Sequence, residues 1–401
     1  MMASERPIRD ADLPFPRFSM AERDRRWSLV RSLMAQEGLA AIIAPDGTGH
    51  YDHWQGDVRY LTQVGGNCVD AAALITVERP AVAFVSEGSW PGLAAPHWGV
   101  EVLPTNRAFA QAMIPVIGDY GLASKRIGVS GLERGLRSAD GQIKWGTMLR
   151  LREAFPDATF VDATMLMQEA RFVKSDEEIA MLERADALAE KAVQAMIDTA
   201  RPGVRESEVY AAMIAAQIAD GGELPTMISW FSGPPGARAQ RLTMASERRI
   251  GSPWYITQEC EARYAGYVAQ RMQPVWIGPL SNDIKAGFEA QKRALFACWE
   301  ALHPGTTFLE LMQISLDAGR GTGFTTPLII HGRGLGDDAP LIVRGQIRCD
   351  VGAVKENAVF QVKPSAEKEG FDGVTWADTV VATANGARRL GKQPIEIAHV
   401  E

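Results

Sequence analysis

A capped amphipathic helix in the middle of the chain constrains the fold more than any other feature of the sequence. Ser175 and Glu178 form a capping box, in which each side chain can reach the backbone N–H of the other residue. Apolar residues then recur at helical spacing, which predicts a long helix with one buried face: Leu182, Ala185, Ala189, Ala192 and Met196. Pro202 ends this helix. The pattern before the helix is different, so we expect a second domain to begin at residue 166.

Strand and helix signals alternate in residues 1–165. This alternation is typical of an α/β domain, and we predict that these residues form one. Its expected helices are residues 22–37 and 144–155, and its expected strands are residues 39–44, 71–77, 81–85, 125–129 and 159–161. The strands at 71–77 and 81–85 are joined by a Pro-containing turn, which indicates a hairpin.

Residues 166–401 show helices in pairs, with strands before and after each pair. This order predicts an α+β domain in which helices cover one face of a curved antiparallel sheet. After the first helix, further helices are expected at residues 206–219, at 282–302 and after Thr307, which has Glu310 as its capping partner. The expected strands are residues 226–231, 254–257, 264–275, 328–331, 358–363 and 373–382.

Composition excludes two classes of partner. The formal charge of −7 and a pI of about 5.6 argue against nucleic acid, whose recognition needs a basic face. No apolar stretch reaches the roughly 20 residues that a membrane helix needs. The N-terminus also lacks the apolar core of a signal peptide. We therefore expect a cytoplasmic protein.

Five short motifs follow one another in a fixed order through the second domain: RFVKSDEEI (171–179), RPGVRESE (201–208), HGRGLG (331–336), AVFQVKP (358–364) and DTVVAT (378–383). Their wording and order resemble the pita-bread enzymes, the superfamily of creatinase, aminopeptidase P and methionine aminopeptidase. The resemblance covers roughly residues 165–400. It implies a C-terminal pita-bread domain, preceded by a smaller α/β domain of the creatinase type, with which the motif DVRYLT (57–62) is compatible.

The same resemblance implies a metal site whose ligands this sequence has largely replaced. Family metallopeptidases hold two divalent ions with two Asp, one His and two Glu. The Asp positions fall on Glu259 and Gln270, and the His position is His331. The Glu positions fall on Lys363 and Ala377, and an ammonium group adds positive charge to a site for dications. We therefore expect neither a metal ion nor a cofactor.

Creatinase itself works without a metal ion, but this sequence departs from creatinase as well. The resemblance places its active-site histidine about seven residues beyond a Ser-Gly pair, and that position is Gln240. A second family histidine, seven residues after the first, corresponds to Asp338. The sequence thus matches the fold of both kinds of enzyme and the active site of neither.

Three residues are candidates for catalysis. His331 ends an apolar strand at a Gly-rich loop, where an imidazole can titrate near neutral pH; its alternative is a hydrogen-bonded structural histidine. Lys363 is either an exposed strand lysine or an inward base and anion anchor. Glu259 is either an acid or base near His331 or the partner of an arginine in a salt bridge.

Further residues are expected to bind the substrate. Arginine recognises carboxylates through two parallel hydrogen bonds, although several of these arginines can equally be solvated loop charges. Trp376 is either a platform for the substrate or a core residue. Arg59 is expected near the site of the partner chain in a homodimer. The full set is Arg59, Arg238, Gln240, Arg241, Gln270, Arg271, Arg333, Asp338 and Trp376.

These residues predict a metal-independent enzyme of the pita-bread superfamily. It is expected to hydrolyse or eliminate a C–N, C–O, C–S or C–C bond in a small carboxylate-bearing metabolite. One alternative is a catalytically dead binding or scaffold protein on the same fold. The remote alternative is a metallopeptidase of the Xaa-Pro type.

Overall fold

The computed structural model describes residues 13, 15–45, 56–65, 70–86, 95–137, 139–235, 244–336, 338–343, 346–349, 351–371 and 373–401. The chain divides into two compact units, Met1–Arg171 and Phe172–Glu401. The division falls within the last turn of a helix, α5 (Thr164–Phe172).

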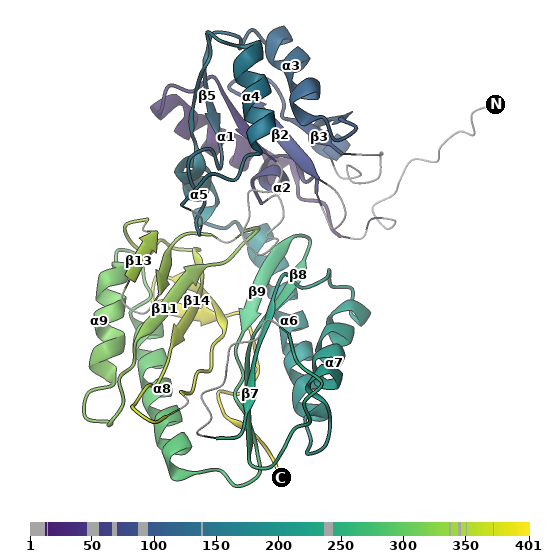
Figure 1. Ribbon diagram of the computed structural model, residues 1–401. Coiled ribbons are helices and arrows are strands. Elements are labelled where there is room, and N and C mark those ends of the chain that lie inside the picture. Colours follow the sequence, from purple (N-terminus) through teal and green to yellow (C-terminus); the bar gives the residue numbers. More distant parts are fainter. Residues whose placement is uncertain are drawn as a thin grey trace, which may run out of the picture. The chain divides into compact units, whose positions relative to one another are not determined.

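The first unit is built on a six-stranded mixed sheet. Besides α5, the elements of this unit are α1 (Met20–Gln36), β1 (Ala41–Ala44), α2 (Gly56–Thr62), β2 (Ala71–Thr76), β3 (Val82–Val85), the 3-10 helix η3 (Ala95–Trp98), β4 (Glu101–Pro104), α3 (Phe109–Asp119), β5 (Arg126–Val129), α4 (Trp145–Ala154) and β6 (Thr159–Asp162). The strand order is β4-β3-β2-β1-β5-β6, and β2 and β3 form the expected antiparallel hairpin. Helices α3 and α4 lie against this sheet (Figure 1), and Met113 and Leu151 on them belong to one buried apolar cluster with residues of the strands. This arrangement confirms the predicted α/β class.

The second unit holds the remaining elements. They are α6 (Asp176–Thr199), α7 (Glu206–Ala219), β7 (Ile228–Gly233), β8 (Trp254–Tyr264), β9 (Tyr267–Arg271), β10 (Val275–Ile277), α8 (Asn282–Glu300), α9 (Phe308–Ala318), β11 (Leu328–Gly332), β12 (Leu341–Val343), β13 (Gln346–Cys349), β14 (Val359–Pro364), β15 (Thr379–Thr383), β16 (Gly386–Arg389) and β17 (Ala398–Val400). The capping box is present as predicted, since the Ser175 side chain accepts a hydrogen bond from the backbone N–H of Glu178 at the start of α6.

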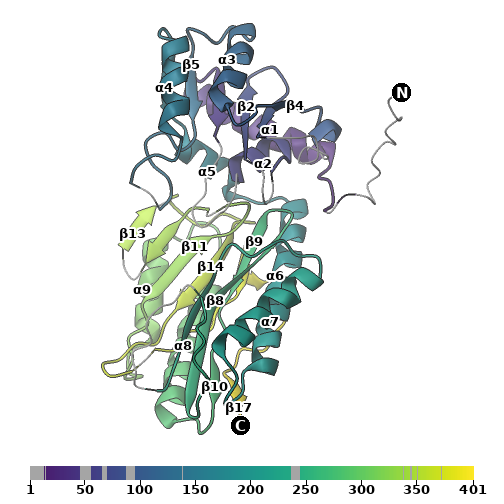
Figure 2. The ribbon, with the colours of Figure 1, turned by 45° about the vertical axis from the view of Figure 1, so that its right-hand side comes forward.

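Two sheets form the second unit. One has the order β17-β10-β8-β7, with β9 paired to β8, and the other has the order β13-β12-β11-β14-β15-β16. Helices α6 and α7 cover the first sheet, and α8 and α9 cover the second (Figures 1 and 2). The sheets meet where the backbone N–H of Gln270 donates to Thr379 Oγ1 at 2.9 Å and Met272 bridges to Ala377. The result is the curved, helix-covered surface of the predicted pita-bread domain.

The hairpin of β8 and β9 corrects one expectation about the strands. We expected separate strands at 254–257 and 264–275, whereas β8 runs unbroken to Tyr264. Ala265 and Gly266 then form a two-residue turn with φ values of 52° and 83°, which is the turn geometry that suits a twisted hairpin. Glu223 accepts a hydrogen bond from the backbone N–H of Gly266 at 2.6 Å and so holds this turn.

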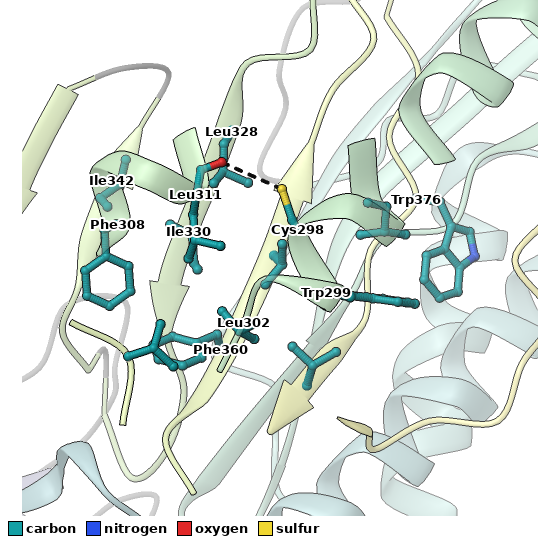
Figure 3. Close-up of a cluster of buried hydrophobic side chains, with 14 of the residues drawn as sticks. Cys298, Trp299, Leu302, Phe308, Leu311, Leu328, Ile330, Ile342, Phe360 and Trp376 are labelled. Atoms are coloured by element: carbon teal, nitrogen blue, oxygen red, sulfur yellow. Dashed lines mark hydrogen bonds between the residues drawn. The ribbon is translucent and has the colours of Figure 1, made fainter. Parts of the chain in front are cut away.

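The core of the second sheet explains which way its strands face. Leu328 and Ile330 of β11 are buried in one apolar cluster with Leu302, which follows the end of α8, and Leu311 of α9 (Figure 3). Side chains on a strand alternate between its two sides, so the remaining residues of these strands face away from the helices. Among the helices of the described part of the chain, none has the length and apolar character to cross a membrane.

Candidate functional site

The inner side of each sheet, opposite its covering helices, carries the chemistry of the second unit. On β8, Ile256 and Cys260 pack against α6 and α7. Glu259 and Glu261 therefore lie on the inner side, since they occupy the alternate positions of the strand. Gln270 of β9 pairs directly with Glu261 in the register of the hairpin and lies on the same side.

The second sheet contributes residues to the same side by the same rule. Ile330 of β11 and Val362 of β14 belong to the core beneath α8 and α9. His331, Gln361 and Lys363 consequently face inward, and His331 lies directly opposite Gln361 in the register of the two strands. We call the resulting group the inner polar cluster, and it consists of Glu259, Glu261, Gln270, His331, Arg333, Gln361, Lys363 and Thr379.

Lys363 occupies the middle of this cluster. Its side chain is 5% exposed, and Nζ donates to Gln270 Oε1 at 3.1 Å and lies 3.7 Å from Glu259 Oε2. Glu259 is the more open of the two acids that face the inner side, at 14% against 2% for Glu261. The inward orientation considered for Lys363 is thus the one observed, and its partners are the two residues at the Asp positions of the family.

Glu261 organises the other end of the cluster. Its Oε1 accepts from Arg333 Nη2 at 2.8 Å and from Gln270 Nε2 at 3.3 Å. Its Oε2 accepts a hydrogen bond from the Thr226 hydroxyl. The sequence analysis did not single out Glu261, because this residue falls between the strands expected at 254–257 and 264–275. The available signal was its spacing, two residues beyond Glu259 on what is one strand.

His331 is buried beside Gln361 at the end of β11. Its Nδ1 lies 3.4 Å from the carbonyl oxygen of Gly332, which is a weak contact. Gln361 Oε1 accepts from Thr379 Oγ1 at 3.2 Å, and Thr379 also ties the cluster to the backbone of Gln270. Gln361 and Thr379 are further members of the site that the sequence did not single out.

The residues at the metal-ligand positions of the family do not fit a pair of divalent ions. Gln270 and Lys363 are hydrogen-bonded to each other, and an ammonium group supplies positive charge where a ligand carboxylate is needed. Ala377 is buried and has no donor atom in its side chain. Within the described part of the chain, no group of three or more His, Cys, Asp or Glu side chains is placed to hold a metal ion.

Arg271 was expected to bind substrate, and the structure corrects this expectation. Its side chain lies on the helix side of β9, one residue out of phase with Gln270. Its Nη1 contacts Asp186 and Asp378 at 2.9 Å and Glu190 at 3.2 Å. Three carboxylates thus hold Arg271 away from the inner polar cluster.

Two other expected substrate-binding residues are structural in the same way. Asp338 forms a buried ion pair with Lys174 at 2.9 Å, so its charge is already used within the fold. Trp376 is buried in the core beside Trp299 (Figure 3), with 6.2 Å between ring centroids. Its Nε1 donates to Gln273. Neither side chain is placed to contact a ligand on the inner side.

Four of the expected substrate-binding residues are not among the members of the inner polar cluster. Arg238, Gln240 and Arg241 lie outside the described residues. Arg59 lies on α2 in the first unit, where it is buried. The expected site residues that the structure brings together are therefore Glu259, Gln270, His331, Arg333 and Lys363.

Comparison with known proteins extends over both units. The model of metallopeptidase family M24 matches residues 180–384, and that of the creatinase/prolidase N-terminal domain matches residues 26–173. The chain is 29% identical over 266 residues to the Xaa-Pro dipeptidase of Pyrococcus furiosus, covering 64% of this chain and 74% of the relative. It is 25% identical over 387 residues to the probable dipeptidase PepE of Mycobacterium tuberculosis, covering 95% and 97%.

Solved structures show the same fold. The Xaa-Pro dipeptidase from Bacillus anthracis superposes with a TM-score of 0.75 at 20% identity, covering 94% of this chain and all of that one. The X-Pro aminopeptidase from Thermotoga maritima superposes with a TM-score of 0.74 at 20% identity, covering 93% and 99%.

These comparisons contradict the main function predicted from the sequence. We expected a metal-independent hydrolase or lyase for a small metabolite, whereas the relatives are named as dipeptidases and aminopeptidases and their family as metallopeptidases. The prediction gave too much weight to the exchanged ligand positions and too little to similarity along the whole chain. The predicted superfamily is correct. The chain belongs to metallopeptidase family M24 and carries a creatinase/prolidase-type N-terminal domain.

Proposed function

We propose that this protein is a peptidase-type hydrolase that acts on Xaa-Pro dipeptides or other short peptides. The observation that carries the proposal is the match to a probable dipeptidase over 95% of the chain. A second relative, matched over 64% of the chain, is named an Xaa-Pro dipeptidase.

The inner polar cluster supplies groups that peptide hydrolysis needs. A proton must leave the attacking water and another must reach the leaving nitrogen. The cluster contains a carboxylate, Glu259, and an imidazole, His331, which are the side-chain types that most often act as general bases or acids. The N–H groups of Lys363 and Arg333 face the same side and can stabilise negative charge on an oxygen.

Release of proline from Xaa-Pro dipeptides tests the proposal. The purified protein would be incubated with Leu-Pro and Ala-Pro, and with Leu-Ala as a comparison. Each incubation would be done in EDTA and in added Mn²⁺, Co²⁺ or Zn²⁺. We expect proline release that His331→Ala abolishes. The absence of proline release under all these conditions would refute the proposal.

A second candidate function is the binding of such a peptide without cleavage. The observation that favours it is the contact of Lys363 with Gln270 and Glu259, which places an ammonium group at the centre of the site. Binding of Leu-Pro in calorimetry, without proline release under any of the metal conditions, would select this function over the first.

A further inference from the structure

Arg333 has hydrogen-bond donors that the fold does not use. Its guanidinium is fully buried and carries five N–H groups. Nη2 is engaged with Glu261 at 2.8 Å, whereas Nε and Nη1 are buried and find no hydrogen-bond partner within the part of the chain that the structure describes. A buried donor without an acceptor loses its hydration without compensation, so unused donors of this kind require an explanation.

Gln361 adds another unused donor on the neighbouring strand. Its Oε1 shares the Thr379 hydroxyl with the carbonyl oxygen of Gln270, and its Nε2 is buried with no partner among the described residues. The backbone N–H of Arg333 donates to the carbonyl of Val359 at 2.8 Å, so Arg333 continues the pairing of β11 with β14. Arg333 and Gln361 therefore present their donors on the same side of adjacent strands.

We propose that Arg333, assisted by Gln361, binds the free carboxylate of the substrate. This inference rests on the proposed function and deepens it, because it makes the ligand a dipeptide or short peptide with a free C-terminus. A carboxylate has four lone-pair positions on two oxygens, and the planar guanidinium matches that geometry.

The charges of the cluster favour a monoanion over a more highly charged group. Glu259 and Glu261 balance Lys363 and Arg333, so the cluster has no surplus positive charge to attract a dianion. What it offers instead is unsatisfied N–H groups, which select a good acceptor. Glu259 is the most exposed of these four residues, so the ligand enters beside it and extends inward toward Arg333.

The test compares a carboxylic acid with its amide in equilibrium binding. The probe is an analogue of Leu-Pro in which a methylene replaces the peptide carbonyl, so that it is not cleaved, prepared with a free C-terminus and as the C-terminal amide. A hydrogen bond to a charged group contributes about 1.5–3 kcal/mol, so we expect the acid to bind the wild type about 10- to 150-fold more tightly in calorimetry.

Arg333→Met is expected to remove this preference by weakening the acid alone, because methionine keeps much of the stem volume and deletes the N–H groups. Arg320→Met, at an exposed arginine on the loop after α9, is the matched control and is expected to bind like the wild type. If Arg333→Met does not fold, the Glu261→Gln/Arg333→Met double variant is tested instead. It also replaces the Glu261 carboxylate, which Arg333→Met alone leaves without its arginine partner.

The outcomes separate this inference from the proposed function. Equal binding of acid and amide to the wild type, or an unchanged preference in Arg333→Met, would overturn the inference while proline release still supports hydrolysis. Failure of both analogues to bind would also overturn it. A preference that Arg333→Met abolishes would support it even if the protein proves to bind peptides without cleaving them.

Discussion

Replacement of Arg271 is the perturbation whose consequence follows most directly from the structure. Its Nη1 lies within 3.2 Å of carboxylate oxygens from Asp186, Glu190 and Asp378, and the first and last of these side chains are fully buried. Among the described residues, Arg271→Met would leave Asp378 paired with Arg389, at 2.8 Å, and would leave Asp186 without a cation. Breaking a buried ion pair from one side costs about 3–5 kcal/mol.

This loss corresponds to a large shift in thermal stability. The unfolding entropy of a globular domain is about 2.1 cal/mol/K per residue, so a unit that spans residues 172–401 should lose about 6–10 °C in Tm. Urea unfolding followed by tryptophan fluorescence would measure the free-energy change directly. Arg388→Met is the matched control, because Arg388 pairs with Glu183 at the surface and such pairs contribute about 0–1 kcal/mol.

The dependence of this loss on pH provides a sharper test. Burial and the neighbouring carboxylate of Asp378 raise the pKa of Asp186 well above its usual value, against the opposing effect of Arg271. A raised pKa means that the folded state holds the proton more tightly, so the contribution of Asp186 to stability is greatest at low pH and is lost as pH rises. Without Arg271 the pKa rises further.

The stability deficit of Arg271→Met should therefore be larger at pH 8 than at pH 5. Binding of a peptide at the inner polar cluster should be unchanged, because Arg271 lies on the helix side of β9. A variant with the stability of the wild type but without peptide binding would refute this reasoning, as would a deficit that is the same at both pH values.

Three further predictions concern the site and its support. His331→Ala should lower proline release at least 100-fold and leave peptide binding measurable in calorimetry, since it removes a proton carrier; a variant that cleaves like the wild type would exclude this role. Lys363→Glu should bind Mn²⁺ more tightly than the wild type in calorimetry, because it replaces an ammonium group by a ligand carboxylate near Glu259, and equal affinities would contradict the fit argument. Ser175→Ala should lower the free energy of unfolding by about 0.5–2 kcal/mol through loss of the α6 cap, with Ser175→Thr retaining most of it in the same urea titration.

The sequence by itself determined the local structure where the signal lies within a few residues. The capping box at Ser175, the cap at Thr307 and the periodic apolar face of α6 each depend on neighbours three or four positions away, and each is present in the structure. The wording and order of five short motifs were enough to recognise the resemblance to the pita-bread fold. The resemblance also singled out His331 and Lys363 as candidate site residues, but it left open whether Lys363 faces inward.

Only the tertiary structure decided which charges meet. Arg271 and Gln270 are adjacent in sequence, but strand alternation puts them on opposite sides of β9, where one meets α6 and the other meets Lys363. The structure shows that β8 is one continuous strand, and this continuity places Glu261 beside Arg333. Pairings between β8, β9, β11 and β14 join residues up to a hundred positions apart. Their energies depend on burial and distance, which no local pattern in the sequence records.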